Sequence, residues 1–385
     1  MLSAAPVNRN NESAEKFSRE QGTVVLYLNN ELHKYSDHES VCHREIAEKL
    51  ATLKGYNFAG QYDPSMRYPT ALYFVPAATL GSETAREIGI FSEQEFFGGV
   101  VPYPFVATKA ITHPLVYSDA FAPPGWSHTF ADQVKDVTLF GHSAFTLDDA
   151  HRAGMLVLGH GPARVKPARG VGGRGQEVVS TADELDAVLT KMDRAEVTNH
   201  GVVIEQNLDR VTTFSVGEVR VSDLIVTYYG KQRLTKDSRN SDVYGGSDLV
   251  VVRGDYDELL KIAPTADLRL AISQARTYDA AAEAFPGFMA SRRNYDVAQG
   301  LDTDARFCSG VLEQSWRIGG ASAAELVALE KFHADPTLRV VRASCVEAYG
   351  DHQVPANAVI QFCGVDDRVG PITKYTMVKS DAGPL

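Results

Sequence analysis

A lysine followed by a glycine-rich stretch is the clearest candidate for chemistry in this sequence. Residues 166–179 are KPARGVGGRGQEVV, with glycines at 170, 172, 173 and 175. A glycine backbone can approach an anion closely and turn several N–H groups toward it, and Lys166 would add a positive charge suited to phosphate. The stretch therefore predicts a phosphate-binding loop. A flexible hairpin with a solvated lysine is the alternative.

The same glycines also satisfy G-x-G-x-x-G, the fingerprint of dinucleotide-binding proteins. That fingerprint requires a helix directly after the glycines, because the pyrophosphate binds at the helix N-terminus. Here the next residues are QEVVS, which favour a strand. A P-loop is excluded because no Lys-Ser or Lys-Thr follows the glycines. We therefore expect a strand–loop–strand hairpin, and a Rossmann dehydrogenase remains only an alternative.

The elements that must position this loop alternate between strands and helices. The alternation at the N-terminal end predicts a small α/β domain with a parallel sheet. The glycines and prolines of residues 96–115 predict a linker, and Tyr244, Gly245 and Gly246 predict a turn. Strands are expected at 23–29, 71–76, 163–168, 175–180, 201–208 and 310–317, a hairpin at 214–230, and helices at 38–55, 79–89, 147–153, 181–193, 256–283 and 323–333.

Composition narrows the class of protein. The chain has 385 residues, 44% of them apolar, which is sufficient for a large core. Its net charge of −11 does not indicate a nucleic-acid-binding protein. No apolar run reaches the roughly 18 residues of a membrane helix. Four cysteines without C-x-x-C spacing argue against a zinc site or a disulfide framework. We expect a cytoplasmic protein with a disordered arm at 1–21, and surface positions for His33, His38 and His43.

Five motifs follow one another along the chain: FVATKAIT with Lys109, RVKPARGVGGRG with Lys166, VVIEQNL at 202–208, RRNYDVAQG with Asp296, and VLEQSWR with Glu313 and Arg317. They resemble the motifs of the ATP-grasp superfamily, in the family's order. The whole chain is also similar to a bacterial ATP-grasp family designated domain of unknown function 3182. The resemblance implies an α/β composite ATP-grasp fold with an N-terminal Rossmann-like pre-ATP-grasp domain. The implied domains are 22–105 for the pre-ATP-grasp domain, 106–208 for the N-terminal lobe with its lid hairpin, and 209–385 for the C-terminal lobe with the metal site.

The resemblance also implies a nucleotide site. ATP phosphates would be held by Lys109, Lys166, Gly172, Gly173 and Gly175. The hinge strand would contact adenine through Glu205 and Gln206, with Leu208 covering the base. Together these residues would place ATP under a glycine-rich lid.

A metal site with one or two Mg²⁺ ions follows from the same resemblance. Asp296 and Glu313 would be carboxylate ligands, which Mg²⁺ prefers together with phosphate oxygens. Ser315 stands where the family has asparagine, so a second metal position would be looser or absent. Arg317 would stabilise the transferring phosphoryl group, and Lys166 and Arg293 would assist.

Residues near these motifs have open roles. Arg292 and Arg293 precede Asp296 and are expected to face the same cleft. Ser322 and Glu325 fit a capping box, with an anion site at the helix N-terminus as the alternative. Lys231 and Arg233 are candidates to reach phosphates or a second substrate.

The function implied by the resemblance is a carboxylate–amine ligase. A substrate carboxylate would attack the γ-phosphate of ATP, and an amine or another nucleophile would then displace phosphate from the acylphosphate. A small-molecule kinase and an ATP-binding regulatory protein without turnover are the alternatives. The partners implied are small molecules and, as in many relatives, a second copy of the chain in a homodimer; no nucleic acid or membrane is expected.

Overall fold

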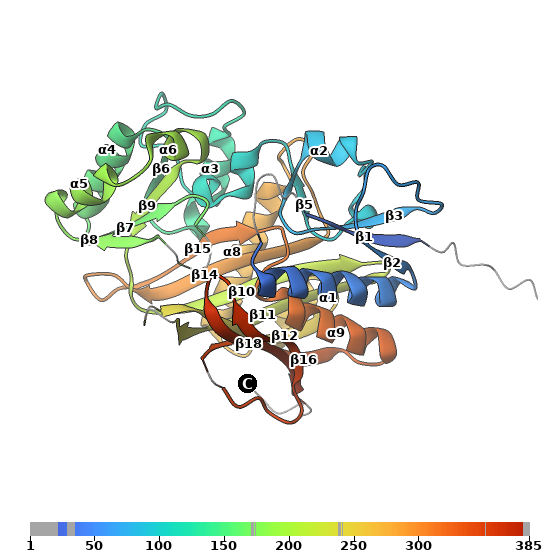
Figure 1. Cartoon of the computed structure of the whole chain (residues 1–385). Helices are drawn as coiled ribbons and strands as arrows, with labels where there is room; N and C mark the ends of the chain where they lie inside the picture. Colours follow the sequence, from blue (N-terminus) through green and yellow to red (C-terminus); the bar gives the residue numbers. More distant parts are fainter. Residues whose placement is uncertain are drawn as a thin grey trace, which may run out of the picture.

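Strands of the chain form four sheets within the part that the structure describes (Figure 1). This computed structural model describes residues 22–28, 35–170, 173, 175–237, 240, 242–350 and 352–379. The arm expected at 1–21, His33 and Gly172 lie outside these residues.

The N-terminal unit contains the parallel sheet that the sequence predicts, in the order β2-β1-β3. Its long helix α1 has a capping box in which Ser36 and Glu39 exchange hydrogen bonds, and it ends at Gly55, whose φ of 67° is left-handed. Strand β2 was not expected. The elements are β1 (Thr23–Tyr27), α1 (Asp37–Lys54), β2 (Asn57–Gln61), β3 (Leu72–Pro76), β4 (Leu80–Gly81), α2 (Ser82–Glu87) and β5 (Gly99–Val101).

Residues 104–112 were expected to be a linker and instead form two short 3₁₀ helices in the interior. Phe105, Val106 and Ile111 belong to the main hydrophobic core, and Lys109 lies among them with 3% exposure. These segments are η2 (Pro104–Ala107) and η3 (Lys109–Thr112), with η1 (Glu93–Glu95) before them and α3 (His128–Val134) and η4 (Lys135–Val137) after them. Packing in the core therefore fixes the position of the Lys109 side chain, whereas a solvent-exposed linker would leave that side chain free to move.

The lid region is a four-stranded antiparallel sheet in the order β6-β9-β7-β8, with helices packed on one face. Strand β7 pairs with β8 across the glycine loop, so the expected strand–loop–strand hairpin is confirmed and no helix follows the glycines. The elements are β6 (Gly141–Ala144), α4 (Leu147–Leu158), β7 (Ala163–Pro167), β8 (Glu177–Val179), α5 (Ala182–Thr190), α6 (Arg194–His200) and β9 (Val202–Gln206).

The C-terminal part is an eight-stranded sheet in the order β15-β14-β10-β11-β12-β16-β18-β17, antiparallel throughout. Tyr244, Gly245 and Gly246 lie inside β12 at a register irregularity, so the predicted turn there is wrong. The strands are β10 (Asp209–Val221), β11 (Leu224–Lys236), β12 (Asp242–Arg253), β13 (Met289–Ala290, paired with β5), β14 (Arg292–Leu301), β15 (Phe307–Ser315), β16 (Val340–Tyr349), β17 (Val359–Asp366) and β18 (Gly370–Lys379).

Helices cover both faces of this large sheet. On one face α7 (Tyr256–Ile262) and α8 (Ala266–Ala282) complete the main core, which includes Tyr295 of β14. On the other face α9 (Ser322–Ala334) packs beside α1, to which the hydrogen bond from Lys49 Nζ to Glu330 Oε1 (3.1 Å) joins it (Figure 1). In the described residues no helix is long and apolar enough to cross a membrane.

Candidate functional site

Two carboxylates of the predicted metal motif meet on the α9 side of the large sheet. Strands β14 and β15 pair so that Asp296 lies directly opposite Glu313, and cross-strand partners project from the same face. Asp296 accepts hydrogen bonds from Asn294 Nδ2 (2.9 Å) and Ser215 Oγ (3.3 Å). Burial, and then the charge of Glu313, raise the pKa of Asp296 to about 6. A bound cation would relieve this repulsion.

The arrangement fits a divalent metal ion with two protein carboxylates. Mg²⁺ in such sites is held by one or two carboxylates, with substrate phosphates and water as the remaining ligands. In the described part of the chain, no three His, Cys, Asp or Glu side chains gather into a metal cluster. The donor set therefore suits a metal shared with a phosphate-bearing substrate better than a closed structural site.

Lys109 connects this pair of carboxylates to the lid. Its Nζ lies 2.7 Å from Glu313 Oε2 and donates a hydrogen bond to the carbonyl oxygen of Gly170 at 2.5 Å. Gly170 follows β7 at the start of the glycine-rich loop, so one buried ammonium group bridges the lid and the metal motif. The structure thus brings together Lys109 and Glu313, which are 204 positions apart (313 − 109).

Lys166 faces the hinge strand. Its Nζ forms a buried ion pair with Glu205, whose second carboxylate oxygen lies 3.0 Å from His113 Nε2. Burial alone would raise the pKa of Glu205, but Lys166 and then His113 outweigh it and lower this pKa to about 2. The Glu205 side chain is thus bound to Lys166, and a contact to adenine stays a prediction for this residue.

The remaining lid and hinge residues lie close to their expected elements. Gly173 and Gly175 have φ values of 80° and 73°, which favour glycine. Gln206 donates a hydrogen bond to Cys308 Sγ at 3.5 Å, and Leu208 is buried. Their roles toward phosphate and base stay predictions.

The buried side chain of Arg292 holds the end of the predicted metal motif in place through hydrogen bonds. Its guanidinium binds both carboxylate oxygens of Glu325 (3.0 and 2.6 Å) and donates to the carbonyl oxygens of Ser315 (3.0 Å) and Arg317 (2.7 Å). The expected capping box is wrong, because α9 begins after Ala321 without a side-chain cap and Glu325 is bound to Arg292. The anion site at this helix N-terminus stays a prediction. Arg317 itself donates to the Ile318 carbonyl oxygen at 2.7 Å.

Arg293 does not face the cleft, which corrects the expectation from the sequence. It lies on the opposite face of β14, where it pairs with Asp279 (3.1 Å), Glu283 (2.7 Å) and Glu93 (3.2 Å). Alternate residues of a strand point to opposite faces, so Arg293 and Asp296, three positions apart, are separated by the sheet. No strand was predicted for RRNYDVAQG, so this alternation of faces could not be applied to it.

The same alternation corrects the expectation that Lys231 and Arg233 reach the phosphates or a second substrate. Lys231 lies over the ring of Phe214 on the α8 side, and Arg233 pairs with Asp248 at 3.3 Å. Between them, Gln232 donates to Ser215 Oγ at 3.0 Å and reaches Asp296. Gln232, Ser215, Asn294 and His113 are thus site residues that were not predicted. Asn294 had a local signal, its position two residues before Asp296, whereas Ser215 and Gln232 reach Asp296 through strand register.

The histidines of α1 also differ from expectation. His38 and His43 are each 8% exposed, so they are buried and not on the surface. His38 Nδ1 lies 2.8 Å from Asp366 Oδ2 at the end of β17. This contact attaches the start of α1 to the large sheet.

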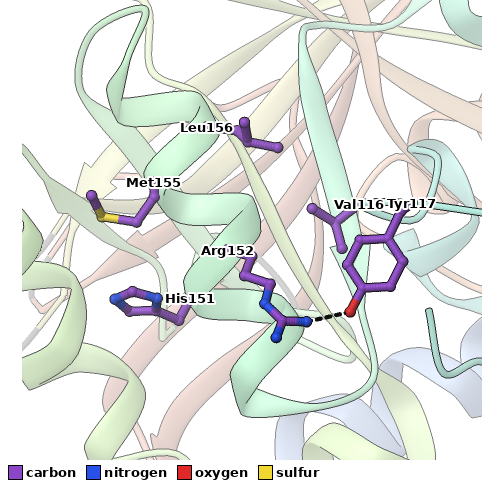
Figure 2. A pocket seen from close by; sticks show the side chains of 6 residues that line it. All are labelled: Val116, Tyr117, His151, Arg152, Met155 and Leu156. Atoms are coloured by element: carbon purple, nitrogen blue, oxygen red, sulfur yellow. Dashed lines mark hydrogen bonds between the residues drawn. The ribbon is translucent and has the colours of Figure 1, made fainter.

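Two surface hollows lie away from these residues. One, of about 450 Å³, is lined by Val116, Tyr117, His151, Arg152, Met155 and Leu156 on the outer side of α4 (Figure 2). The other, of about 230 Å³, is lined by residues of β1, α1 and β2 and by Leu28. Neither contains a residue of the predicted nucleotide or metal site.

Comparisons with known proteins agree with this architecture. Residues 25–376 of the chain match the family described as "Protein of unknown function (DUF3182)". No sequence among curated proteins matches it.

Similar solved structures include a biotin carboxylase from Campylobacter jejuni, with 10% identity, 93% of this chain and 87% of that chain covered, and a TM-score of 0.51. The biotin carboxylase domain of Hydrogenobacter thermophilus 2-oxoglutarate carboxylase has 11% identity, 94% and 86% coverage, and a TM-score of 0.53. An N5-carboxyaminoimidazole synthase from Aspergillus clavatus has 11% identity, 94% and 95% coverage, and a TM-score of 0.50. All three have the ATP-grasp fold, and at these identities the likeness concerns the fold alone. The chain therefore belongs to the DUF3182 family and has the ATP-grasp fold, with a Rossmann-like domain before it.

Proposed function

We propose that this protein is an ATP- and Mg²⁺-dependent ligase that joins a carboxylate to an amine through an acylphosphate. The observation that carries the proposal is the meeting of the Asp296–Glu313 pair with Lys109, whose ammonium group lies 2.7 Å from Glu313 and also bonds to the lid. The order of these motifs and the fold support it. The solved ATP-grasp structures include complexes with ADP and, in one, Mg²⁺ and bicarbonate.

The residues of the chain divide the work of phosphoryl transfer. Asp296 and Glu313 would hold Mg²⁺, which supplies charge neutralisation between the phosphates and the incoming oxygen. Lys109 and Lys166 would exchange their present carboxylate partners for phosphate oxygens, with the N–H groups of the glycine loop above them. Phosphoryl transfer needs positioning and charge stabilisation more than a protein nucleophile, so two lysines and two carboxylates are sufficient for this step.

The bonds of the proposed reaction balance as follows. An oxygen of the substrate carboxylate attacks the γ-phosphorus, and the bond from that phosphorus to the bridging oxygen of ADP breaks. The amine nitrogen then attacks the carbonyl carbon of the acylphosphate, phosphate leaves, and the nitrogen gives up a proton to solvent. Arg317, next to Ser315 in the metal motif, would stabilise the oxygen that carries the developing charge.

The test is release of ADP and phosphate from ATP in the presence of pooled carboxylates and amines, with mass detection of the adduct. The proposal expects Mg²⁺-dependent release that requires both substrates and a product heavier by the amine minus water. A stable phosphorylated product without free phosphate would indicate a kinase. Binding of Mg²⁺–ATP without turnover in any pool would indicate a regulatory protein; in that case the looser position at Ser315 would be the first feature to examine.

A further inference from the structure

Three ionisable side chains gather in the interior around the hinge strand. They are His113, which follows η3, Lys166 of β7 and Glu205 of β9, and we call them the buried triad. Their side chains are 1%, 2% and 2% exposed. Glu205 is the partner of both others, because one of its carboxylate oxygens pairs with Lys166 Nζ and the other lies 3.0 Å from His113 Nε2.

The hydrogen bonds of the triad define where its protons are. Burial opposes the charge of Glu205, but Lys166 and His113 outweigh it and hold its pKa at about 2. An ionised carboxylate only accepts hydrogen bonds, so His113 Nε2 carries a hydrogen and donates it. His113 Nδ1 is buried and has no hydrogen-bond partner among the described residues. With a neutral imidazole, the triad therefore has no net charge.

The other charged groups near the triad are already bound elsewhere. Arg164 lies opposite Glu205 across the β7–β9 pair, but its guanidinium donates to two side-chain amide oxygens at 2.7 and 3.4 Å. Lys109 of η3 is paired with Glu313 of β15. Burial lowers the pKa of His142, the β6 histidine whose charge would act on the triad, so this ring is neutral at neutral pH. None of these groups replaces the lysine of the triad without losing its present bonds or gaining a charge.

Phosphate binding would leave the triad with an unbalanced charge. In the proposed function, Lys166 exchanges Glu205 for phosphate oxygens of ATP. Loss of one partner from a buried ion pair is strongly destabilising, because the other charge is left without compensation. Imidazole is the side-chain group that ordinarily gains its charge near neutral pH, and His113 is already bonded to Glu205. A proton added to Nδ1 would break none of the hydrogen bonds present and would restore an ion pair.

We propose that His113 takes up one proton from solvent when Lys166 turns from Glu205 to the phosphates of ATP. The Lys166–Glu205 ion pair breaks, an ammonium–phosphate pair forms, and an imidazolium–carboxylate pair between His113 and Glu205 replaces the lost one. His113 is thus a positioning residue that keeps Glu205 paired in both states and leaves Lys166 free to move. The inference rests on the proposed function for the nucleotide, and it adds that ATP binding weakens as the pH rises.

The first experiment needs no nucleotide. Lys166→Met removes the ammonium group permanently, so Glu205 should keep His113 protonated at about pH 7.5, where an unperturbed imidazole is mostly neutral. The ¹⁵N chemical shifts of the histidine rings in the labelled full-length protein distinguish imidazolium from imidazole, and His113→Gln identifies the signal. Lys191→Met, which removes an exposed lysine near Glu177, is the control and should leave the ring neutral. A neutral His113 ring in folded Lys166→Met overturns the inference.

The second experiment counts protons when Mg²⁺–ATP binds. Calorimetry in HEPES and in Tris, which differ in their heats of ionisation, gives the number of protons taken up. The unmodified protein should take up about one proton, and its Kd for Mg²⁺–ATP should rise by up to about tenfold per pH unit above neutral pH.

Two histidine variants assign the proton to the triad. His113→Gln keeps a donor for Glu205 but cannot become charged, so it should take up clearly fewer protons and bind Mg²⁺–ATP roughly tenfold more weakly. His151→Gln is the control, because His151 also pairs with a carboxylate, that of Asp186 at 3.3 Å, but on the surface. It should behave as the unmodified protein does. Equal proton uptake by His113→Gln and the unmodified protein contradicts the inference.

Failure of the inference and failure of the proposed function give different results. If Lys166→Met protonates His113 but Mg²⁺–ATP neither releases heat nor raises the melting temperature of the unmodified protein, the proposed function falls and its coupling to the triad falls with it. If Mg²⁺–ATP binds without proton uptake and His113 stays neutral in Lys166→Met, the ligase function stands and only the inference is rejected.

Discussion

Single residues of the candidate site are paired with each other in ways that a bound nucleotide would change. Lys109 bonds to Glu313 and Lys166 to Glu205, so each buried lysine is paired with a carboxylate. Exchange of these carboxylates for phosphate oxygens would preserve the pairing of charge, which keeps the cost of burial low. The roles of individual residues can therefore be separated by substitutions that keep shape and change charge.

Glu313→Gln removes one of the two charges that would hold Mg²⁺ and keeps the size of the side chain. We expect Mg²⁺-dependent ATP turnover to fall roughly 10²–10³-fold, the usual loss when one stabilising group is removed from a transition state. Melting temperature should fall as well, because the buried Lys109 loses its carboxylate partner, so turnover is compared well below the unfolding transition. Asp304→Asn, an exposed carboxylate in the turn between β14 and β15, is the control. Activity within a few-fold of the unmodified protein would show that the metal site is elsewhere.

Arg293→Met tests the correction made by the structure. The buried carboxylate of Asp279 would lose its guanidinium partner at 3.1 Å, and breaking a buried pair in this way costs roughly 3–5 kcal/mol. Urea unfolding should detect this loss, whereas the KM of ATP for the folded enzyme should stay unchanged. Arg276→Met, which removes an exposed pair with Asp257, should cost at most about 1 kcal/mol. If turnover is lost while stability is unchanged, Arg293 acts in catalysis, as the sequence predicted.

At the scale of elements, strand pairing decides which side chains reach the site. The pairing of β14 with β10 and β15 places Asp296, Ser215 and Glu313 on one face of the sheet. Hydrogen bonds from Arg292 to the carbonyl oxygens of Ser315 and Arg317 hold the segment that follows β15. Helix α1 reaches the same face from the N-terminal domain because its first turn is anchored to the end of β17. The candidate site is thus assembled from distant segments, with Lys109 of η3 meeting the paired strands β10, β14 and β15.

Asp366→Ala tests that anchor. Asp366 accepts hydrogen bonds from the backbone N–H of His38 (3.1 Å), Arg368 (2.9 Å) and Val369 (3.1 Å), and its carboxylate also pairs with the His38 ring. Burial works against the charge, but these bonds lower the pKa of Asp366 well below its ordinary value. We expect a loss of roughly 2–3 kcal/mol in the free energy of unfolding at neutral pH.

The pH dependence of this loss has a definite sign. A carboxylate whose pKa is lower in the folded state stabilises the protein above its unfolded pKa, near 4, and loses that effect as the pH falls through the folded value. The difference between Asp366→Ala and the unmodified protein should therefore be constant above about pH 5 and decrease below pH 4. The exposed neighbour is the control, since Asp367→Ala should show neither effect. A difference that persists unchanged at low pH would contradict the charge-based anchor.

At the scale of the whole molecule, the lid sheet lies at one end of the view in Figure 1 and the N-terminal sheet at the other, with strands of the large sheet below both. The bonds of Lys109 to Gly170 and Glu313 cross between the lid and the large sheet. A ligand that binds between them would add contacts to both and so stabilise the folded state as a whole.

Mg²⁺–ATP should therefore raise the free energy of unfolding by about 2.7 kcal/mol at a concentration a hundred times its Kd. Thermal unfolding with increasing Mg²⁺–ATP measures this directly. Lys109→Met and Lys166→Met should each reduce the shift at a fixed concentration, because each removes a phosphate partner. Arg169→Met, an exposed residue next to the lid that pairs with Glu196, should not. Stabilisation by NAD⁺ in place of Mg²⁺–ATP would revive the dinucleotide alternative.

The sequence by itself determined the order of most elements and the type of fold. Strand β7, the glycines and strand β8 could be predicted because local propensity excludes a helix after Gly175. Lys109, Lys166, Asp296 and Glu313 could be named from motifs, since each motif is short and lies within one element. These features depend on neighbours in the chain, so local patterns are sufficient to find them.

Only the tertiary structure decided which residues share the site. Neighbouring residues of a strand point to opposite faces of the sheet. Whether Arg293 and Gln232 face the site therefore depends on where the strands run and how they pair, which no local pattern specified. The burial of His43 depends on α1 packing against α9 and β17, about 300 positions later in the chain. Contacts between distant segments are fixed by packing of the whole fold, because no single stretch contains both partners.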